Sequence, residues 1–178
     1  MKILVLTGSP RSDGNSVFLA ENFIRGAEEA GHDVAVFHAA KKRIHPCTAC
    51  EHCHTSTDMK CVFDDDMKEL NPLLLRADAV VFATPVYYYG ITAQLAAAIN
   101  RFYANDELLK GDKKSALLLT YADDSDATAD GPVRTYQNML KYLEWEDGGM
   151  VIAKGCQEKD AVSKTDYPMM AYRLGADF

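Results

Sequence analysis

The chain has 178 residues, of which 48% are hydrophobic and 25% are charged, and its formal net charge is −7. These values are typical of a soluble globular protein, and a negative chain without a basic stripe argues against a nucleic-acid partner. The apolar runs fall well short of the ~20 residues that a membrane helix needs, and no secretory signal is recognisable. We therefore expect no membrane partner, a cytoplasmic location and a single domain over residues 1–178.

Short apolar runs alternate along the chain with stretches of helical period. The runs predict strands at about 2–7, 33–38, 79–84, 115–121 and 149–153. The periodic stretches predict helices at about 15–31, from 66 onward, 91–102, 133–143 and, in an otherwise irregular tail, 168–174. Asp66 and Glu69 have the spacing of a capping box, and Pro72 is expected to kink or split the helix that follows them. Alternating strands and helices predict an α/β fold with a doubly wound parallel sheet.

The loop after the first predicted strand has the composition of a phosphate-binding loop. It is small and hydroxylated, it contains one arginine, and it leads directly into a helix whose free N–H groups favour an anion. It has neither the Gly-Lys-Ser/Thr ending of a Walker A loop nor a GxGxxG motif. An alternative is a simple polar turn with Asn15 or Ser16 as the helix cap. The candidate phosphate-binding residues are Ser9, Arg11, Gly14, Asn15 and Ser16.

The loop after the third predicted strand is aromatic. It contains three consecutive tyrosines between a proline and a glycine, and three neighbouring side chains cannot all point into the core. In doubly wound sheets, ligands bind at the carboxyl ends of the strands, where the strand order reverses. This edge would bring together loops 9–16, 85–90 and 121–124. A phosphate loop beside an aromatic loop suits FMN, with candidate ring contacts at Pro85, Val86, Tyr87, Tyr88, Tyr89, Gly90 and Tyr121.

These motifs resemble a known family. The runs at 8–16 and 83–95, together with Arg101, are similar to those of the NAD(P)H-dependent FMN reductase group of the flavodoxin-like superfamily. The resemblance implies a three-layer, five-stranded parallel sheet in the order 2-1-3-4-5, FMN as cofactor and NAD(P)H as donor. Two positions depart from the pattern, because members often have lysine where Ala96 stands and aspartate where Asn100 stands. Both lie along a helix away from the predicted flavin loops.

A cysteine-rich insertion at about 44–63 follows the second predicted strand. Its spacing, C-x2-C-x2-C-x7-C, suits four thiolates around a [4Fe–4S] cluster, and it resembles the cysteine motif of the iron–sulfur flavoproteins. A structural zinc site and reduced thiols that bind nothing remain alternatives. A phosphatase-type Cys-x5-Arg site is excluded, because Cys53 stands at the arginine position. Cys156 is expected to be a buried apolar residue. The candidate metal ligands are Cys47, Cys50, Cys53 and Cys61.

The sequence therefore predicts an FMN-dependent oxidoreductase. It would use NAD(P)H or a reduced carrier to reduce a quinone, a flavin or another redox acceptor. A [4Fe–4S] cluster, where present, would pass single electrons to a ferredoxin-like carrier. The alternative is a non-enzymatic, flavodoxin-like electron-transfer protein. The resemblance also implies a homodimer or homotetramer with FMN near the interface between subunits.

Overall fold

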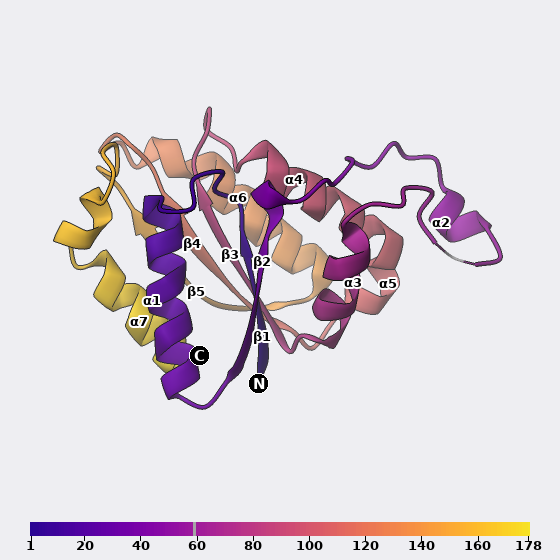
Figure 1. The fold of residues 1–178 in the computed structure, drawn as a ribbon, viewed down its shortest axis with the longest axis horizontal. Helices are drawn as coiled ribbons and strands as arrows, with labels where there is room; N and C mark the ends of the chain where they lie inside the picture. Colours follow the sequence, from indigo (N-terminus) through magenta and orange to yellow (C-terminus); the bar gives the residue numbers. More distant parts are fainter. Residues whose placement is uncertain (59) are drawn as a thin grey trace.

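A computed structural model of the protein describes residues 1–58 and 60–178. Its centre is a five-stranded sheet in the order β2-β1-β3-β4-β5, in which every neighbouring pair is parallel (Figure 1). This confirms the predicted sheet and its strand order. The order reverses direction between β1 and β3. The strands are β1 Lys2–Thr7, β2 Asp33–His38, β3 Ala79–Pro85, β4 Lys114–Thr120 and β5 Glu146–Ala153.

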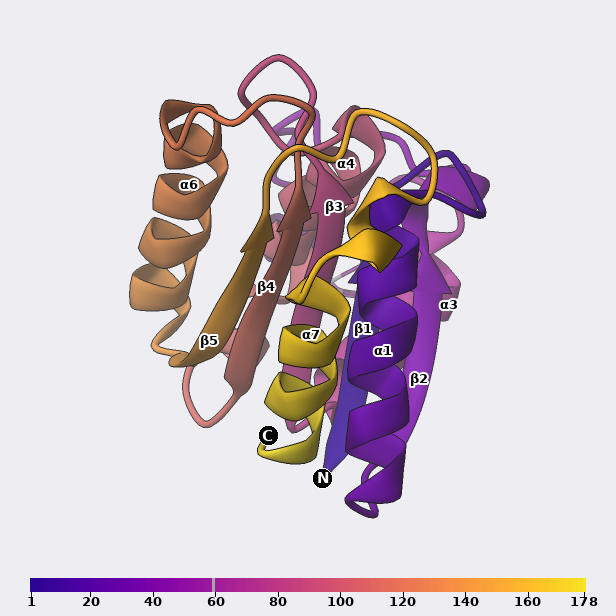
Figure 2. The same ribbon diagram turned by 90° about the vertical axis from the view of Figure 1, so that its left-hand side faces the viewer.

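Helices cover both faces of the sheet (Figure 2). The helices α1 (Asn15–Glu29) and α7 (Tyr167–Ala176) share one face. The other face carries α3 (Met67–Arg76), α4 (Ala93–Asn100) and α6 (Ala127–Leu143). Short helical turns complete the described chain: η1 Ala39–Lys41, α2 His52–Thr55, η2 Arg101–Asn105, α5 Asp106–Leu109 and η3 Ala161–Lys164.

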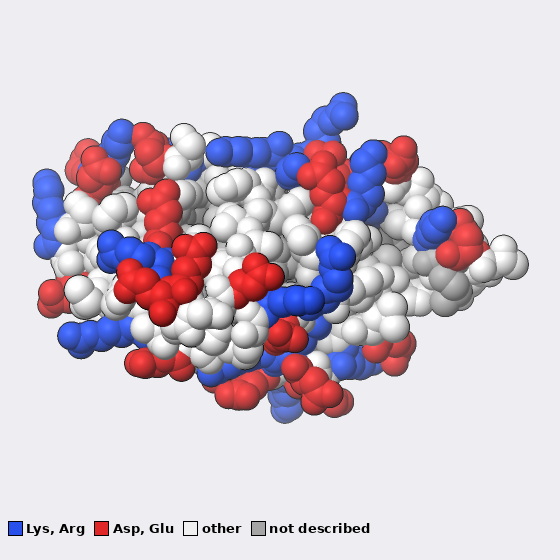
Figure 3. All heavy atoms as spheres, turned by 60° about the horizontal axis from the view of Figure 1, so that its bottom comes forward, with Lys and Arg blue, Asp and Glu red and all other residues white. Residues whose placement is uncertain are grey.

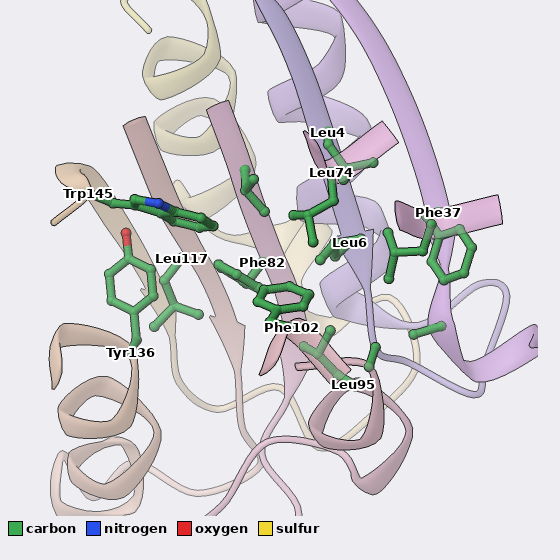
Figure 4. Close-up of a cluster of buried hydrophobic side chains, with 14 of the residues drawn as sticks. Leu4, Leu6, Phe37, Leu74, Phe82, Leu95, Phe102, Leu117, Tyr136 and Trp145 are labelled. Carbon is green, nitrogen blue, oxygen red and sulfur yellow. The ribbon is translucent and has the colours of Figure 1, made fainter. Parts of the chain in front are cut away.

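The sheet separates two hydrophobic clusters, because successive strand residues point to opposite faces. Ile3 and Val5 belong to the cluster under α1 and α7, whereas Leu4 and Leu6 belong to the cluster under α3, α4 and α6. Phe82 lies centrally in the second cluster among the side chains drawn in Figure 4. Continuous apolar strands of this kind are typical of parallel sheets that are covered on both faces.

Helix α7, in the C-terminal tail, packs along α1, and the two helices lie side by side in Figure 2. Their backbones approach closely at two glycines. A Cβ atom on Gly26 would lie 2.1 Å from the carbonyl oxygen of Tyr172, and one on Gly175 would lie 2.1 Å from that of Phe23. The predicted tail helix is confirmed, but its close contact with α1 was not anticipated.

Several element boundaries differ from the predictions. The predicted capping box is wrong. Helix α3 begins at Met67, but the carboxylate of Asp66 accepts a hydrogen bond from the N–H of Arg43 at 2.7 Å instead of capping the helix. The side chain of Glu69 pairs with Lys42. Helix α3 also continues through Pro72 without being split. Both α6 and β5 begin earlier than expected, because their first residues are too polar or too small to show a periodic pattern.

The surface carries charges of both signs. On the face that is shown in Figure 3, lysine and arginine side chains lie interspersed with aspartate and glutamate side chains. Within residues 1–58 and 60–178, every helix is too short or too polar to cross a lipid bilayer.

Candidate functional site

The three predicted loops at the carboxyl edge of the sheet and a fourth segment, residues 156–157, enclose a pocket of about 270 Å³. Hydrogen bonds extend the strand pairing into these loops. The N–H of Gly8 donates to the carbonyl of Ala83, and the N–H of Val86 donates to the carbonyl of Thr120, both at 2.8 Å. The pocket lies beside the reversal of strand order between β1 and β3, where doubly wound folds bind ligands. Its lining comprises Ser9, Arg11, Gly14, Asn15, Ser16, Pro85, Val86, Tyr87, Thr120, Tyr121, Ala122, Cys156 and Gln157.

The first loop presents the N-terminus of α1 to this pocket. Gly14, in an extended conformation, occupies the cap position, and no side chain in the described part of the protein caps the helix. The alternative in which Asn15 or Ser16 caps α1 is therefore wrong. The Ser9 hydroxyl is buried and held in a local turn, donating to the carbonyl of Arg11 at 3.0 Å and accepting from its N–H at 3.1 Å. An uncapped helix N-terminus that faces a pocket is an anion-binding arrangement.

The side chain of Asn15 has a different role from the predicted one. Its amide nitrogen donates to the carbonyls of Cys156 at 3.1 Å and Glu158 at 2.9 Å, and its oxygen accepts from the N–H of Val162 at 3.1 Å. The amide thus ties the segment 156–162 to the first turn of α1. The contribution that we still expect from Asn15 to a bound phosphate is its backbone N–H.

Replacing Asn15 with alanine is expected to loosen the segment 156–162. Three hydrogen bonds would be lost, each worth about 1 kcal/mol in net terms, so hydrogen exchange of these amides by local opening should accelerate roughly 100-fold. Hydrogen–deuterium exchange with peptide resolution measures this directly. The control is Asp13→Ala, which removes only an exposed ion pair with Lys159. Equal acceleration in both variants would show that the amide of Asn15 is not the tether.

The tyrosine run forms a tight hairpin above the carboxyl edge, in the loop between β3 and α4 (Figure 1). The N–H groups of Tyr87 and Gly90 donate to each other's carbonyls at 2.9 and 3.1 Å, and Tyr88 and Tyr89 between them have φ of +49° and +61°. Two bulky residues in the left-handed region make this an unfavourable turn. Tyr87 lines the pocket, whereas Tyr88, fully exposed, and Tyr89 do not. Ring contacts by Tyr88, Tyr89 and Gly90 remain predictions.

Three residues of the pocket lining were missed by the sequence, Thr120, Cys156 and Gln157, whereas Ala122 lies in the expected loop 121–124. Cys156 is buried, as predicted, but it also borders the pocket, because its N–H donates to the carbonyl of Tyr121 at 2.8 Å. Burial raises the pKa of the Cys156 thiol, so this thiol stays protonated at neutral pH. No local motif marks residues 156 and 157; they reach the pocket only because β5 lies beside β4 and Asn15 holds the segment that follows.

The cysteine arm, residues 44–63, projects from the body of the protein near α2 (Figure 1). Cys47 and Cys50 are exposed, Cys53 is buried and Cys61 is partly buried. Burial and the neighbouring thiols, above all Cys61, raise the pKa of Cys53. Within the described residues, no three histidine, cysteine, aspartate or glutamate side chains come together as a metal site. The [4Fe–4S] cluster therefore remains a prediction.

An ion pair holds the two ends of the arm against η2. The Arg101 guanidinium donates through Nη1 to the carbonyl of His45 at 2.8 Å and to the carboxylate of Asp65 at 2.6 Å. Arg101 is 3% exposed, and its charge lies 5.2 Å from the ring of Phe63, which stacks on His45. One buried cation thus fixes where the arm leaves the body and where it returns.

Comparison with known proteins agrees with this geometry. The sequence pattern that defines the NADPH-dependent FMN reductase family matches residues 1–145. The chain belongs to this family. Among solved structures, this FMN reductase family member resembles an NAD(P)H:quinone oxidoreductase from Methanothermobacter marburgensis, with a TM-score of 0.79, 20% identity and coverage of 99% and 98% of the two chains. An azoreductase from Bacillus anthracis has a TM-score of 0.73, 19% identity and full coverage of both chains. At these identities the likeness concerns the fold.

Several curated relatives are named iron-sulfur flavoproteins. An iron-sulfur flavoprotein of Archaeoglobus fulgidus is 37% identical to this reductase family member over 124 residues, which cover 68% of the present chain and 55% of the relative. The chain spans about half the length of the curated relatives that it matches first. The match therefore leaves much of each relative without a counterpart in this chain.

The two departures from the reductase pattern lie together in the fold. Ala96 and Asn100 both line an apolar pocket of about 180 Å³ between α4 and α6, together with Leu95, Ile99 and Met139. Neither position belongs to the lining of the pocket at the carboxyl edge. As expected, these departures change a helix surface and leave the candidate flavin loops untouched.

Proposed function

We propose that the protein is an FMN-dependent oxidoreductase that takes electrons from NAD(P)H and passes them to a quinone, a flavin or a similar acceptor. The observation that carries this proposal is the uncapped N-terminus of α1, which faces a pocket at the strand-order reversal beside Arg11. Membership of the NADPH-dependent FMN reductase family supports it. The activity, the substrates and the partners are inferences from these features.

The residues of the pocket fit a flavin mononucleotide in two parts. The first turn of α1, the Ser9 hydroxyl and the Arg11 guanidinium would hold the phosphate, since they combine free N–H donors with a permanent charge. Pro85, Val86 and Tyr87 would line one side of the ring, and Tyr121 and Ala122 would line another. FMN, when bound, supplies hydride acceptance and donation, and the chain contributes binding and orientation.

The pocket is small for a whole FMN molecule. Its volume of about 270 Å³ lies just below the usual range for ligand pockets, about 300–1,000 Å³. Part of the ring would therefore stay open beside Tyr87, which is 45% exposed. An open ring face lets the nicotinamide donor and the acceptor approach in turn, as a ping-pong reductase requires.

The proposal is tested by Arg11→Ala. Loss of a charged hydrogen bond to a phosphate costs about 1.5–3 kcal/mol, so the affinity for FMN should fall roughly 10- to 100-fold, while riboflavin, which lacks the phosphate, should bind as before. Fluorescence titration of the apoprotein measures both ligands. Arg134→Ala, on an exposed position of α6, is the control. Unchanged FMN affinity in Arg11→Ala would contradict the assignment of the phosphate site.

A turnover assay distinguishes the proposed reductase from the alternative, a non-enzymatic electron-transfer protein. Steady-state oxidation of NADPH or NADH in the presence of a quinone is expected for the reductase. Absence of turnover with every quinone and flavin acceptor, in a protein that still binds FMN, would instead support the flavodoxin-like electron-transfer protein.

We propose further that a second copy of the chain packs against the tyrosine hairpin, so that FMN lies near the interface between subunits while one face of its ring stays accessible. Tyr88 and Tyr89 are 101% and 66% exposed at the tip of an unfavourable hairpin, which suits a surface that is buried on association. Sedimentation of the FMN-loaded protein should show a dimer or tetramer, and Tyr88→Asp should shift it toward monomer. A monomeric parent protein at micromolar concentration would contradict this assembly.

Binding of a [4Fe–4S] cluster by Cys47, Cys50, Cys53 and Cys61 remains a separate prediction. The spacing of the four thiols and the names of the curated relatives favour it. Iron and sulfide assays on anaerobically purified protein test it, since the cluster would contribute about four irons per chain. The reductase proposed above does not depend on the outcome.

A further inference from the structure

Helix α6 carries a glycine, Gly131, where the tyrosine hairpin meets the helix. A Cβ atom on Gly131 would lie 2.6 Å from the backbone carbonyl oxygen of Tyr89, whereas real Cβ atoms keep more than 3.0 Å from such an atom. Glycine inside a helix is less favourable than alanine, because it loses more conformational freedom on folding. The close approach of the hairpin backbone accounts for a glycine at this position.

The segment that leaves the hairpin also runs beside α6. Ile91 directly follows the hairpin and Pro132 directly follows Gly131, and both line the apolar pocket between α4 and α6. Two successive positions of each segment are therefore close to the other segment. The contact at Gly131 is part of an extended approach between the hairpin and the helix.

The hairpin is anchored at its base and strained at its tip. At the base, the N–H of Val86 donates to the carbonyl of Thr120 at 2.8 Å. At the tip, Tyr88 and Tyr89 both have positive φ, a conformation that persists in bulky residues only where the surrounding structure holds it. The contact of the Tyr89 carbonyl with Gly131 lies at this strained end.

A methyl group on Gly131 would displace the hairpin and leave α6 in place. The helix is fixed by side chains in the hydrophobic core, among them Ala129, Tyr136 and Leu140. The hairpin tip has no such anchor, because the side chains of Tyr88 and Tyr89 are exposed. The hairpin would then pivot about its base, and Tyr87 would move with it, because two hydrogen bonds join Tyr87 to Gly90.

We propose that Gly131 is a positioning residue for flavin binding, because it lets the Tyr89 carbonyl lie directly on α6 and so sets where Tyr87 stands. This role rests on the proposed function, since Tyr87 lines the pocket at the carboxyl edge. Gly131 does not belong to the described lining of that pocket, so it acts through Tyr87. The phosphate-binding loop 9–16 lies on another element, so the ring and the phosphate of FMN should respond separately.

The test compares Gly131→Ala with the parent chain in fluorescence titrations with FMN and with riboflavin. Both affinities should fall by the same factor, roughly three- to tenfold for a disturbed aromatic contact. The ratio of the two affinities should stay that of the parent protein, in contrast to Arg11→Ala, which should change it. The bound flavin should also fluoresce more strongly, because a tyrosine that is displaced from the ring quenches it less.

Two further variants make the assignment specific. Tyr87→Ala removes the side chain through which Gly131 acts, so adding Gly131→Ala to it should lower neither affinity further. Asn138→Ala, on an exposed position of α6, is the control, because it also introduces a better helix former. The urea midpoint of Gly131→Ala should stay near that of the parent, since the hairpin yields and the core does not.

The outcomes separate this role from the proposed function. A folded Gly131→Ala protein with the parent's riboflavin affinity and flavin fluorescence would overturn the role of Gly131 and leave the function intact. An undiminished loss of affinity in the Tyr87→Ala background would do the same, and so would a large fall in the urea midpoint, which would mean that α6 moves instead. A parent chain that binds neither flavin would overturn both proposals.

Discussion

Gly26→Ala is expected to destabilise the protein by about 3 kcal/mol, at the upper end of the usual cost of overpacking a core. The new methyl group would lie 2.1 Å from the backbone carbonyl of Tyr172, and a backbone atom cannot rotate away as a side chain would. Helices α1 and α7 would have to separate along their contact. The better helix propensity of alanine returns only about 1 kcal/mol. Urea unfolding should show the loss, and the melting temperature should fall by roughly 6–12 °C for a chain of this size.

The reciprocal contact sharpens this prediction. Gly175→Ala places its methyl group 2.1 Å from the carbonyl of Phe23 and should cost about the same. Because one separation of the helices relieves both clashes, the double variant should lose clearly less than the sum of the single losses. Glu28→Ala, on an exposed position of α1, is the control for helix propensity. A neutral or stabilised Gly26→Ala protein would contradict the close approach of the two helices.

The fold could be predicted largely because its strands are continuously apolar. Residues 79–84 and 115–120 are buried on both faces, as expected for central strands of a parallel sheet that is covered on both sides. The first residues of β5, from Glu146 to Gly148, were missed, since polar and glycine residues give no strand signal. The contact between α1 and α7 was missed for a related reason: glycine is visible in a sequence, but the backbone that requires it is not.

The candidate site was predictable only where one short segment supplies several groups. The loop 9–16 contributes five lining residues and follows a strand directly, so its position was fixed by the sheet. Cys156 and Gln157 depend on the tether from Asn15, a long-range contact without a motif. The expected capping box failed because the N–H of Arg43 competes for the Asp66 carboxylate. Short sequence motifs predict contacts between neighbouring residues. A residue that is distant in sequence can take the place of the predicted partner, and the motif does not reveal it.

Asp65→Asn is expected to be as damaging as the glycine substitutions, and its effect should centre on the cysteine arm. The carboxylate pairs with Arg101 at 2.6 Å and also accepts from the N–H groups of His45 at 3.0 Å and Met67 at 3.1 Å. The Asp65 side chain is 12% exposed and that of Arg101 is 3% exposed. Removing one partner of a buried pair leaves an uncompensated charge and costs about 3–5 kcal/mol. Urea unfolding measures the total loss, and limited proteolysis should show faster cleavage within residues 46–64.

The pH dependence of the same contact follows from the pKa of Asp65. Burial raises this pKa, but the hydrogen bonds from His45 N–H and Arg101 outweigh burial, so the pKa lies below its usual value. The carboxylate therefore stabilises the fold above its unfolded-state pKa of about 3.9, and this contribution is lost as the pH falls through the lower folded-state value. Cleavage of the arm by an acid-active protease should rise below about pH 4 in the parent protein. It should change less with pH in Asp65→Asn, which has no carboxylate to titrate.

The neighbouring residue provides a matched control, because Asp64→Asn makes the same chemical change one position away. The side chain of Asp64 is 92% exposed and lies 3.7 Å from that of Lys68, which is itself 67% exposed. An exposed pair of this kind contributes little, so Asp64→Asn should stay within about 0.5 kcal/mol of the parent protein. If the two variants lost the same stability, the contact between Arg101 and Asp65 would be an ordinary surface pair. A large loss in Asp65→Asn alone, with early cleavage in the arm, would show that this buried ion pair holds both ends of the cysteine arm to the body of the protein.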